Sequence, residues 1–207
     1  MNFILSFNIA AFVKAAGYLG ILGIVFAESG LFLGFFLPGD SLIFTAGFLA
    51  SRGYLNIAVL IAVCFAGAVS GDSFGYAFGK KTGPRIFKKE DSLLFKKSHL
   101  EKAKIFYEAH GGKTLILARF MPIVRTFAPI LAGVGEMNYS VFLVYNAVGG
   151  ALWAAGLPIL GYLLGNIIPN IDRYIAPFVI LIIILSVLPP FIHAARRGEI
   201  KWKKTKN

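Results

Sequence analysis

Four charged side chains lie within otherwise apolar segments of this 207-residue chain, namely Glu28, Asp40, Arg119 and Arg125. An unpaired charge near the centre of a bilayer costs about 2.5–3.5 kcal/mol on insertion scales, so such side chains must face one another or water. A guanidinium fork matches the oxygens of a phosphate or carboxylate, and carboxylates within a membrane often exchange protons. We therefore predict one buried site in which the two arginines bind a phosphate group and the two acids couple its movement to protons.

A purely structural alternative is that these residues form two buried salt bridges that fasten the segments together, with Asp40 capping a helix. Buried ion pairs stabilise a fold poorly, because apolar residues in the same positions are often no less stable. Asp72 is a secondary candidate, for which local capping or hydrogen bonding is the favoured interpretation. The sequence has no metal-ligand spacing and no nucleotide-binding loop, so neither a metal nor a cofactor is predicted.

The composition indicates a membrane protein, since 57% of residues are hydrophobic and 15% are charged. In a soluble domain, roughly a quarter of all residues are usually charged. Ten of the 21 basic residues lie between Lys80 and Lys113, and six lie between Arg196 and Lys206. Basic segments between apolar spans stay cytoplasmic, so this pattern predicts a multi-pass protein of the cytoplasmic membrane and no nucleic-acid partner. The segment 80–113 is expected to be either an amphipathic element on anionic lipid or an ordinary loop.

Four segments are apolar and about long enough to cross a bilayer. They are Gly17–Leu37, Tyr54–Gly79, Tyr139–Gly165 and Tyr174–Ala195. A fifth segment, Thr114–Val134, contains two arginines and two prolines. If it crossed fully, the basic tail 196–207 would lie outside the cell, against the positive-inside tendency. We therefore predict that Thr114–Val134 dips into the membrane, turns at Pro122 and returns on the same side.

A second hairpin of this kind is predicted over Glu28–Ser51, with its tip at Pro38 and Gly39, where the helix must break. The two hairpins are related in sequence: Phe36–Leu37–Pro38 matches Phe120–Met121–Pro122 at an offset of 84, and two glycine-containing matches follow at 86. One span separates the hairpins, so they should enter from opposite sides, which is a transporter architecture.

The fold class expected is therefore an all-α polytopic membrane protein with two inverted repeats, each a re-entrant hairpin followed by a transmembrane helix, plus flanking helices. The chain is expected to form one integral membrane domain over 1–207. Its parts are the first repeat 15–79, the basic segment 80–113, the second repeat 114–165, the last span 174–195 and the tail 196–207. Glycines at 67, 71, 75 and 79 recur on one helix face and predict close helix packing.

Several motifs occur in a specific order: Glu28 before Phe36–Leu42, then Gly71–Asp72, Gly79–Gly83, Arg119–Thr126 and Ala132–Gly133. In these motifs the sequence resembles the DedA family, whose domain is also called SNARE-associated or VTT, over roughly residues 15–195. The resemblance implies two opposed re-entrant hairpins and essential roles for the positions of the four buried charges. It also implies proton-dependent return of undecaprenyl phosphate across the cytoplasmic membrane, or scrambling of phospholipids in more distant members.

The function predicted is a lipid-phosphate translocase rather than an enzyme, with a lipid phosphate, protons and anionic membrane lipids as partners. Other hypotheses are a proton-coupled carrier for a small anion, a phospholipid scramblase, a membrane phosphatase, and an assembly factor without cargo. The cargo, the direction of movement, the oligomeric state and the side of the N-terminus are left open.

Overall fold

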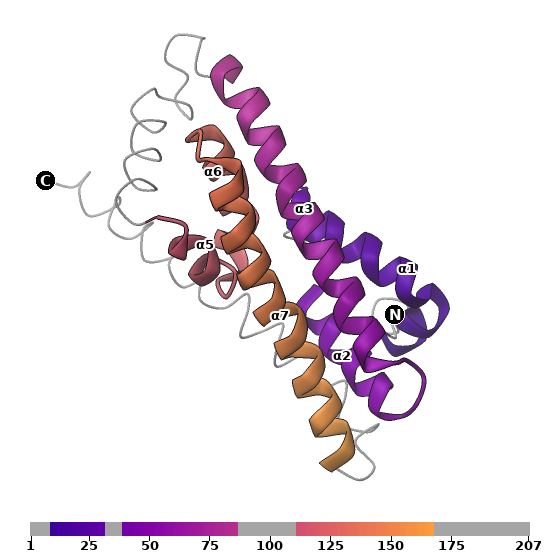
Figure 1. Cartoon of the computed structure of the whole chain (residues 1–207). Coiled ribbons are helices and arrows are strands. Elements are labelled where there is room, and N and C mark those ends of the chain that lie inside the picture. The colour runs from indigo at the N-terminus through magenta and orange to yellow at the C-terminus, as the bar shows by residue number, and fades with distance from the viewer. Residues whose placement is uncertain (1–8, 32–38, 87–110, 168–207) are drawn as a thin grey trace, which may run out of the picture. The chain divides into compact units, whose positions relative to one another are not determined.

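The computed structural model describes residues 9–31, 39–86 and 111–167, and all of its helices belong to one compact unit, Met1–Ile167. Within these ranges every regular element is an α-helix, and no strand is present (Figure 1). The helices are α1 (Ile9–Gly30), α2 (Gly39–Ser51), α3 (Ile57–Ile86), α5 (Lys113–Ala118), α6 (Pro122–Val134) and α7 (Tyr139–Ile167). The prediction of an all-helical fold is confirmed for the described residues.

Two helices, α3 and α7, are long and apolar enough to cross a membrane, over Ile57–Gly83 and Tyr139–Ile167. At 1.5 Å per residue each reaches about 40 Å, more than the hydrocarbon thickness of about 30 Å. Both expose large apolar side chains, as lipid-facing helices do: Val59, Phe74 and Phe78 on α3, and Val144, Leu152, Leu160 and Leu163 on α7. These helices match the predicted spans at 54–79 and 139–165.

Helix α3 continues past Gly79 to Ile86, so Lys80 and Lys81 lie on its last turns and not in a loop. The predicted boundary at Gly79 is displaced because this glycine serves packing: a Cβ there would meet the carbonyl of Ile130 on α6. The remainder of the basic segment up to residue 110, the span Tyr174–Ala195 and the tail lie outside the described residues.

The N-terminal helix differs from the predicted span Gly17–Leu37. Helix α1 begins at Ile9, bends at Gly17, where φ is 57° and ψ is −157°, and ends at Gly30. Glycine reaches positive φ without a steric penalty, which explains why the bend falls at this residue. The apolar part after the bend, Ala16–Gly30, extends about 22 Å and is too short to cross alone. Residues 32–38, including the predicted tip residue Pro38, lie outside the described residues.

The segment 114–134 is broken into two short helices, as a hairpin requires. Helix α5 ends at Ala118, and α6 begins at Pro122 after an extended residue, Met121. Proline suits the first turn of a helix because its missing N–H would have no partner there. Helix α2 begins at Gly39, with Asp40 in its first turn. At about 20 Å or less, none of these three helices spans a bilayer.

The glycine row of α3 is a packing surface, as predicted, and it receives two different helices. A Cβ on Gly67 would lie 3.1 Å from the Leu22 carbonyl of α1, and one on Gly71 would lie 2.7 Å from the Phe26 carbonyl. Further along the row, Gly79 faces α6. Close backbone approach at these positions therefore fixes α1 and α6 against α3.

The short helices α2 and α6 each pack on one long helix. Gly47 of α2 lies against the Pro158 carbonyl of α7, and Gly161 of α7 lies against the Phe44 carbonyl of α2. Similarly, Gly133 of α6 lies against the Tyr76 carbonyl of α3. Each of the two short helices thus contacts the long helix that is distant from it in sequence.

Candidate functional site

Arg125, in the first turns of α6, binds two carboxylates from two other helices. Its Nη1 donates to Asp40 Oδ1 at 2.6 Å, and its Nη2 donates to Glu28 Oε1. Glu28 is only 4% exposed and lies in the last turn of α1, whereas Asp40 lies in the first turn of α2. Three helix ends therefore meet at one guanidinium, and the sequence prediction that these three charges share a site agrees with this geometry.

Gly39 allows Glu28 to reach this position. A Cβ on Gly39 would overlap the Glu28 carboxylate, so the side chain rests directly on the backbone at the start of α2. The N-terminus of a helix favours a carboxylate because its N–H groups and dipole are positive. The sequence predicted Gly39 as a helix break, and the structure adds close approach as a second reason for glycine here.

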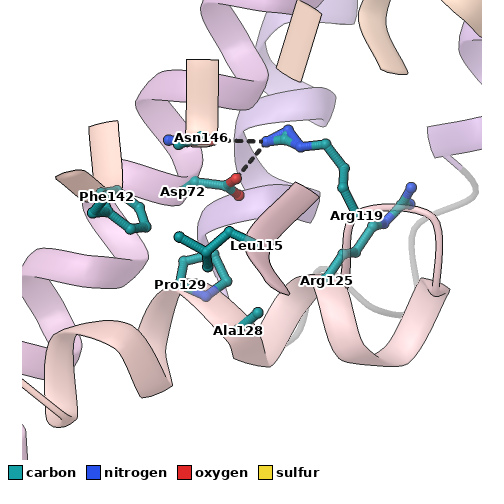
Figure 2. A pocket seen from close by; sticks show the side chains of 8 residues that line it. All are labelled: Asp72, Leu115, Arg119, Arg125, Ala128, Pro129, Phe142 and Asn146. Carbon is teal, nitrogen blue, oxygen red and sulfur yellow. Dashed lines mark hydrogen bonds and ion pairs between the residues drawn. The ribbon is translucent and has the colours of Figure 1, made fainter. Parts of the chain in front are cut away.

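Arg119, at the C-terminal end of α5, belongs to a second cluster. Its Nη2 donates to the Asp72 carboxylate and to Asn146 Oδ1 at 3.2 Å (Figure 2). The Asn146 amide also donates to the Val69 carbonyl at 3.2 Å, which fixes its oxygen toward the guanidinium. Arg119 is 6% exposed. The carboxylate of Asp72 is therefore bound by an arginine 47 residues away and does not cap its own helix.

Trp153 of α7 touches a member of each cluster. Its indole Nε1 donates to Asp40 Oδ1 at 3.0 Å. The Cζ atoms of Arg125 and Arg119 lie 5.1 Å and 5.9 Å from the centre of its ring. Both distances fall within the range of a cation–π interaction. The two arginine clusters are therefore neighbours across one aromatic side chain.

Asp72, Arg119 and Arg125 border two hollows. The first is completed by Leu115, Ala128, Pro129, Phe142 and Asn146, with an empty volume of about 250 Å³ (Figure 2). The second, of about 200 Å³, is completed by Ser29 and Trp153. Both volumes include the space between atoms and space that is open to the surroundings, and the room left for a guest is about that of one water molecule. A larger group would reach the guanidiniums only if side chains moved.

The charges of the described site do not balance. Three carboxylates, those of Glu28, Asp40 and Asp72, face two guanidiniums, and all are largely buried. The site can therefore take up a proton and still keep a carboxylate on each arginine. An incoming anion would instead compete with the carboxylates for the same donors.

Two contributing residues were missed at the sequence level, Asn146 and Trp153. Asn146 is one of few polar residues in the span 139–165, which is a signal that could have identified it. Trp153 lies seven residues further, on the same helix face. Of the predicted tip residues, Gly39 and Pro122 begin α2 and α6, while Pro38 lies outside the described residues.

Comparison with known proteins finds relatives of this chain. The model of the VTT domain matches residues 37–163. The chain is 42% identical to Protein DedA of Escherichia coli K12 over 185 residues, covering 88% of this chain and 84% of that protein. It is 44% identical to an uncharacterized membrane protein of Mycobacterium tuberculosis over 86% of this chain and 78% of the relative. It is 31% identical to the inner membrane protein YqjA of E. coli K12 over 90% and 84%. No solved structure matches.

Proposed function

This chain belongs to the DedA family of VTT-domain membrane proteins, and we propose that it moves the phosphate-bearing head group of a lipid across the cytoplasmic membrane together with protons. The observation that carries the proposal is the pair of buried arginines, bound by three carboxylates within apolar helices. Buried charged side chains are energetically costly within a membrane, and they usually mark a transport pathway and not a contact that only stabilises the fold.

Phosphate is the cargo group that the two guanidiniums fit best. Arg119 and Arg125 lie close to the same tryptophan ring and border the same hollows. Each presents a planar fork of N–H donors that can bind two phosphate oxygens at once. The start of α6, just before Arg125, adds helix N–H groups that favour an anion.

Proton coupling follows from the competition for these donors. In the structure both terminal nitrogens of Arg125 are bound to carboxylates, so a phosphate can take these donors only where a carboxylate releases them. Protonation removes the charge that holds Glu28 or Asp40 to Arg125. A singly charged phosphate that replaces a protonated acid returns the site to the net charge it had before protonation, and cargo and proton then move in the same direction.

The architecture that we propose contains two inverted repeats with re-entrant hairpins, α1–α2 and α5–α6. The packing glycines support it, because they are related by the same sequence offset. Phe44 and Ile130 are 86 residues apart: the Phe44 carbonyl lies against Gly161 of α7, and the Ile130 carbonyl lies against Gly79 of α3. Gly47 and Gly133 are also 86 residues apart: Gly47 lies against a carbonyl of α7, and Gly133 lies against a carbonyl of α3. Helix α3 lies between the two hairpins in sequence. If α3 crosses the membrane completely, the second hairpin enters from the side opposite to the first.

The cargo that we favour is undecaprenyl phosphate or a related polyprenyl phosphate. Phe120, Met121 and Val124, beside the two arginines in sequence, are 38–58% exposed and apolar, as a surface touching lipid tails would be. A phospholipid phosphate offers the same head-group chemistry. We expect no change in the covalent structure of the cargo, so the protein would be a transporter and not an enzyme.

The experiment is lipid-phosphate movement in proteoliposomes that carry an imposed proton gradient. Labelled polyprenyl phosphate should cross faster with protein, and faster still with the gradient. Glu28→Gln should lose the acceleration by the gradient, because glutamine keeps the shape but cannot ionise. Uptake of inorganic phosphate instead would indicate a small-anion carrier. Equal movement of all phospholipids without a gradient would indicate a scramblase, and release of inorganic phosphate from the lipid would indicate a phosphatase.

A further inference from the structure

Trp153 is the side chain through which the two arginine clusters meet. Its N–H group is directed at Asp40 of α2, and its ring lies beside Arg125 of α6 and Arg119 at the end of α5. The remaining charged groups of the site, Glu28 of α1 and Asp72 of α3, are bound to those same arginines. Every described charge of the site is therefore one or two contacts away from this indole.

The hydrogen bond from Trp153 depends on the charge of Asp40. A donor bonded to an ionised carboxylate makes a shorter and roughly twice as strong bond as one bonded to a neutral group. The Asp40 Oδ1 atom accepts from both Trp153 and Arg125, at 3.0 Å and 2.6 Å. If this carboxylate gains a proton, both donors lose a charged acceptor at the same time, and Arg125 keeps its bond to Glu28. The position of the ring is then no longer held by its N–H group.

The face of α7 that carries Trp153 also reaches Arg119. Asn146, Gly150 and Trp153 follow one another at helical spacing on that face. A Cβ on Gly150 would lie 3.5 Å from Arg119 Nη1 and 3.1 Å from Val69 Cγ2, so the guanidinium lies directly over the α7 backbone. Arg119 is therefore held between Asn146 and Trp153, and displacement of the ring removes one of its contacts with α7.

We propose that Trp153 is a positioning residue that couples the two clusters. It contacts both arginines while its N–H group is held by the ionised Asp40, and these contacts loosen together when Asp40 is protonated, while Glu28 stays on Arg125 and Asp72 on Arg119. This inference rests on the proposed function, because it gives the means by which one proton loosens the surroundings of both guanidiniums at once. Trp153 lies in the second repeat, so a residue of that repeat responds when Asp40 of the first hairpin is protonated.

Fluorescence provides a direct test, since the chain contains two tryptophans, Trp153 and Trp202. The reference protein is W202F in lipid nanodiscs, in which Trp153 is the single emitter. Its emission spectrum should shift along an acid-to-alkaline pH series, and the D40N/W202F protein should show no such shift. An emission spectrum that does not depend on pH in the reference protein, or that shifts equally in the D40N/W202F protein, overturns the inference.

The transport assay gives the second readout. W153F/W202F keeps an aromatic ring but lacks the N–H donor, so it should fold with a melting temperature somewhat below that of W202F. Its transport should fall roughly tenfold relative to W202F and lose its dependence on the proton gradient, as expected for a lost hydrogen bond to a charged group. Full, gradient-dependent transport by W153F/W202F overturns the role of Trp153 but leaves the proposed function intact. If W202F itself moves no lipid phosphate, the proposed function fails, whereas the fluorescence experiment still decides the role of Trp153.

Discussion

Arg125 differs from Arg119 in the number of carboxylates that it binds. Its two terminal nitrogens bind Asp40 and Glu28 separately, whereas Arg119 uses one nitrogen for both Asp72 and Asn146. The planar fork of a guanidinium is thus used fully only at position 125. This distinction predicts how each arginine responds to replacement by lysine.

Arg125→Lys should preserve the charge of the site but not its geometry. A lysine ammonium is a single point and cannot bridge two carboxylates and later two phosphate oxygens as a fork does. We expect the variant to insert and fold, and lipid-phosphate transport to fall at least roughly tenfold. Wild-type transport by Arg125→Lys in proteoliposomes would show that the arginine only neutralises the acids.

Gly39→Ala should displace Glu28 from Arg125, because the added Cβ would overlap the carboxylate. Overpacking of this kind costs about 1–3 kcal/mol, so both the melting temperature and transport should fall. Gly23→Ala on α1 is the matched control, since a Cβ there meets no atom within 4 Å. Equal behaviour of the two variants would mean that the close approach at Gly39 is unimportant.

The sequence was sufficient to identify the charges of the site, but not all of their partners. Glu28, Asp40, Arg119 and Arg125 are conspicuous because each is expensive within an apolar segment. The pairing of Asp72 with Arg119 joins residues 47 positions apart, and no local pattern encodes it. Trp153 was missed because a tryptophan in an apolar span resembles any lipid-facing or core aromatic.

At the scale of helices, the glycine contacts between α6 and α3 and between α2 and α7 hold the site together. Arg125 lies on α6 and Asp40 on α2, so the docking of these short helices sets the distance between the two charges. Loss of close packing at either contact should therefore affect stability and transport together.

Gly133→Ala and Gly47→Ala each test one of these contacts. An added Cβ would press on the Tyr76 carbonyl in the first case and on the Pro158 carbonyl in the second. A backbone atom cannot move aside as a side-chain tip can, so we expect each variant to lose about 1–3 kcal/mol of stability. Gly156→Ala on α7, with open space around its Cβ, should melt like the wild type. Wild-type melting of all three variants would contradict the packing described.

The long helices were predictable, and the ends of elements were less so. The apolar lengths of α3 and α7 indicate spans, and the prolines of the segment 114–134 indicate a break there. The start of α1 before Gly17 and the continuation of α3 to Ile86 were not predicted. Glycines at 17 and 79 look alike in sequence, yet one bends a helix and the other packs within it, because tertiary contacts decide between these roles.

At the scale of the whole molecule, the proposed topology predicts which residues share a side of the membrane. In a C64A background, cysteines replacing Lys81, Lys113 and Ser140 should be labelled from the cytoplasmic side. All three positions are exposed, at the end of α3 and on either side of the α5–α6 hairpin. Cysteines replacing the exposed residues Arg52 and Asn166 should be labelled from the opposite side.

The position that decides the topology is Ser140. If the segment 113–134 crossed the membrane completely, Ser140 would lie on the side opposite to Lys81 and Lys113. Labelling of S140C from outside the cell would therefore contradict the re-entrant hairpin and, with it, the inverted repeat. Labelling of all three from the cytoplasm is the result that we expect.

The central claim is that the buried ion pairs serve transport and not only stability, and Arg119 and Asp72 offer the most direct test. These two charges pair one to one, so Arg119→Gln with Asp72→Asn removes both and leaves no unpaired charge. Each single variant should lose about 3–5 kcal/mol of stability, because it strands a buried charge. The measurement is the melting temperature and the lipid-phosphate transport of the double variant. We predict that its melting temperature recovers toward wild type while transport stays absent; recovery of transport would contradict the account.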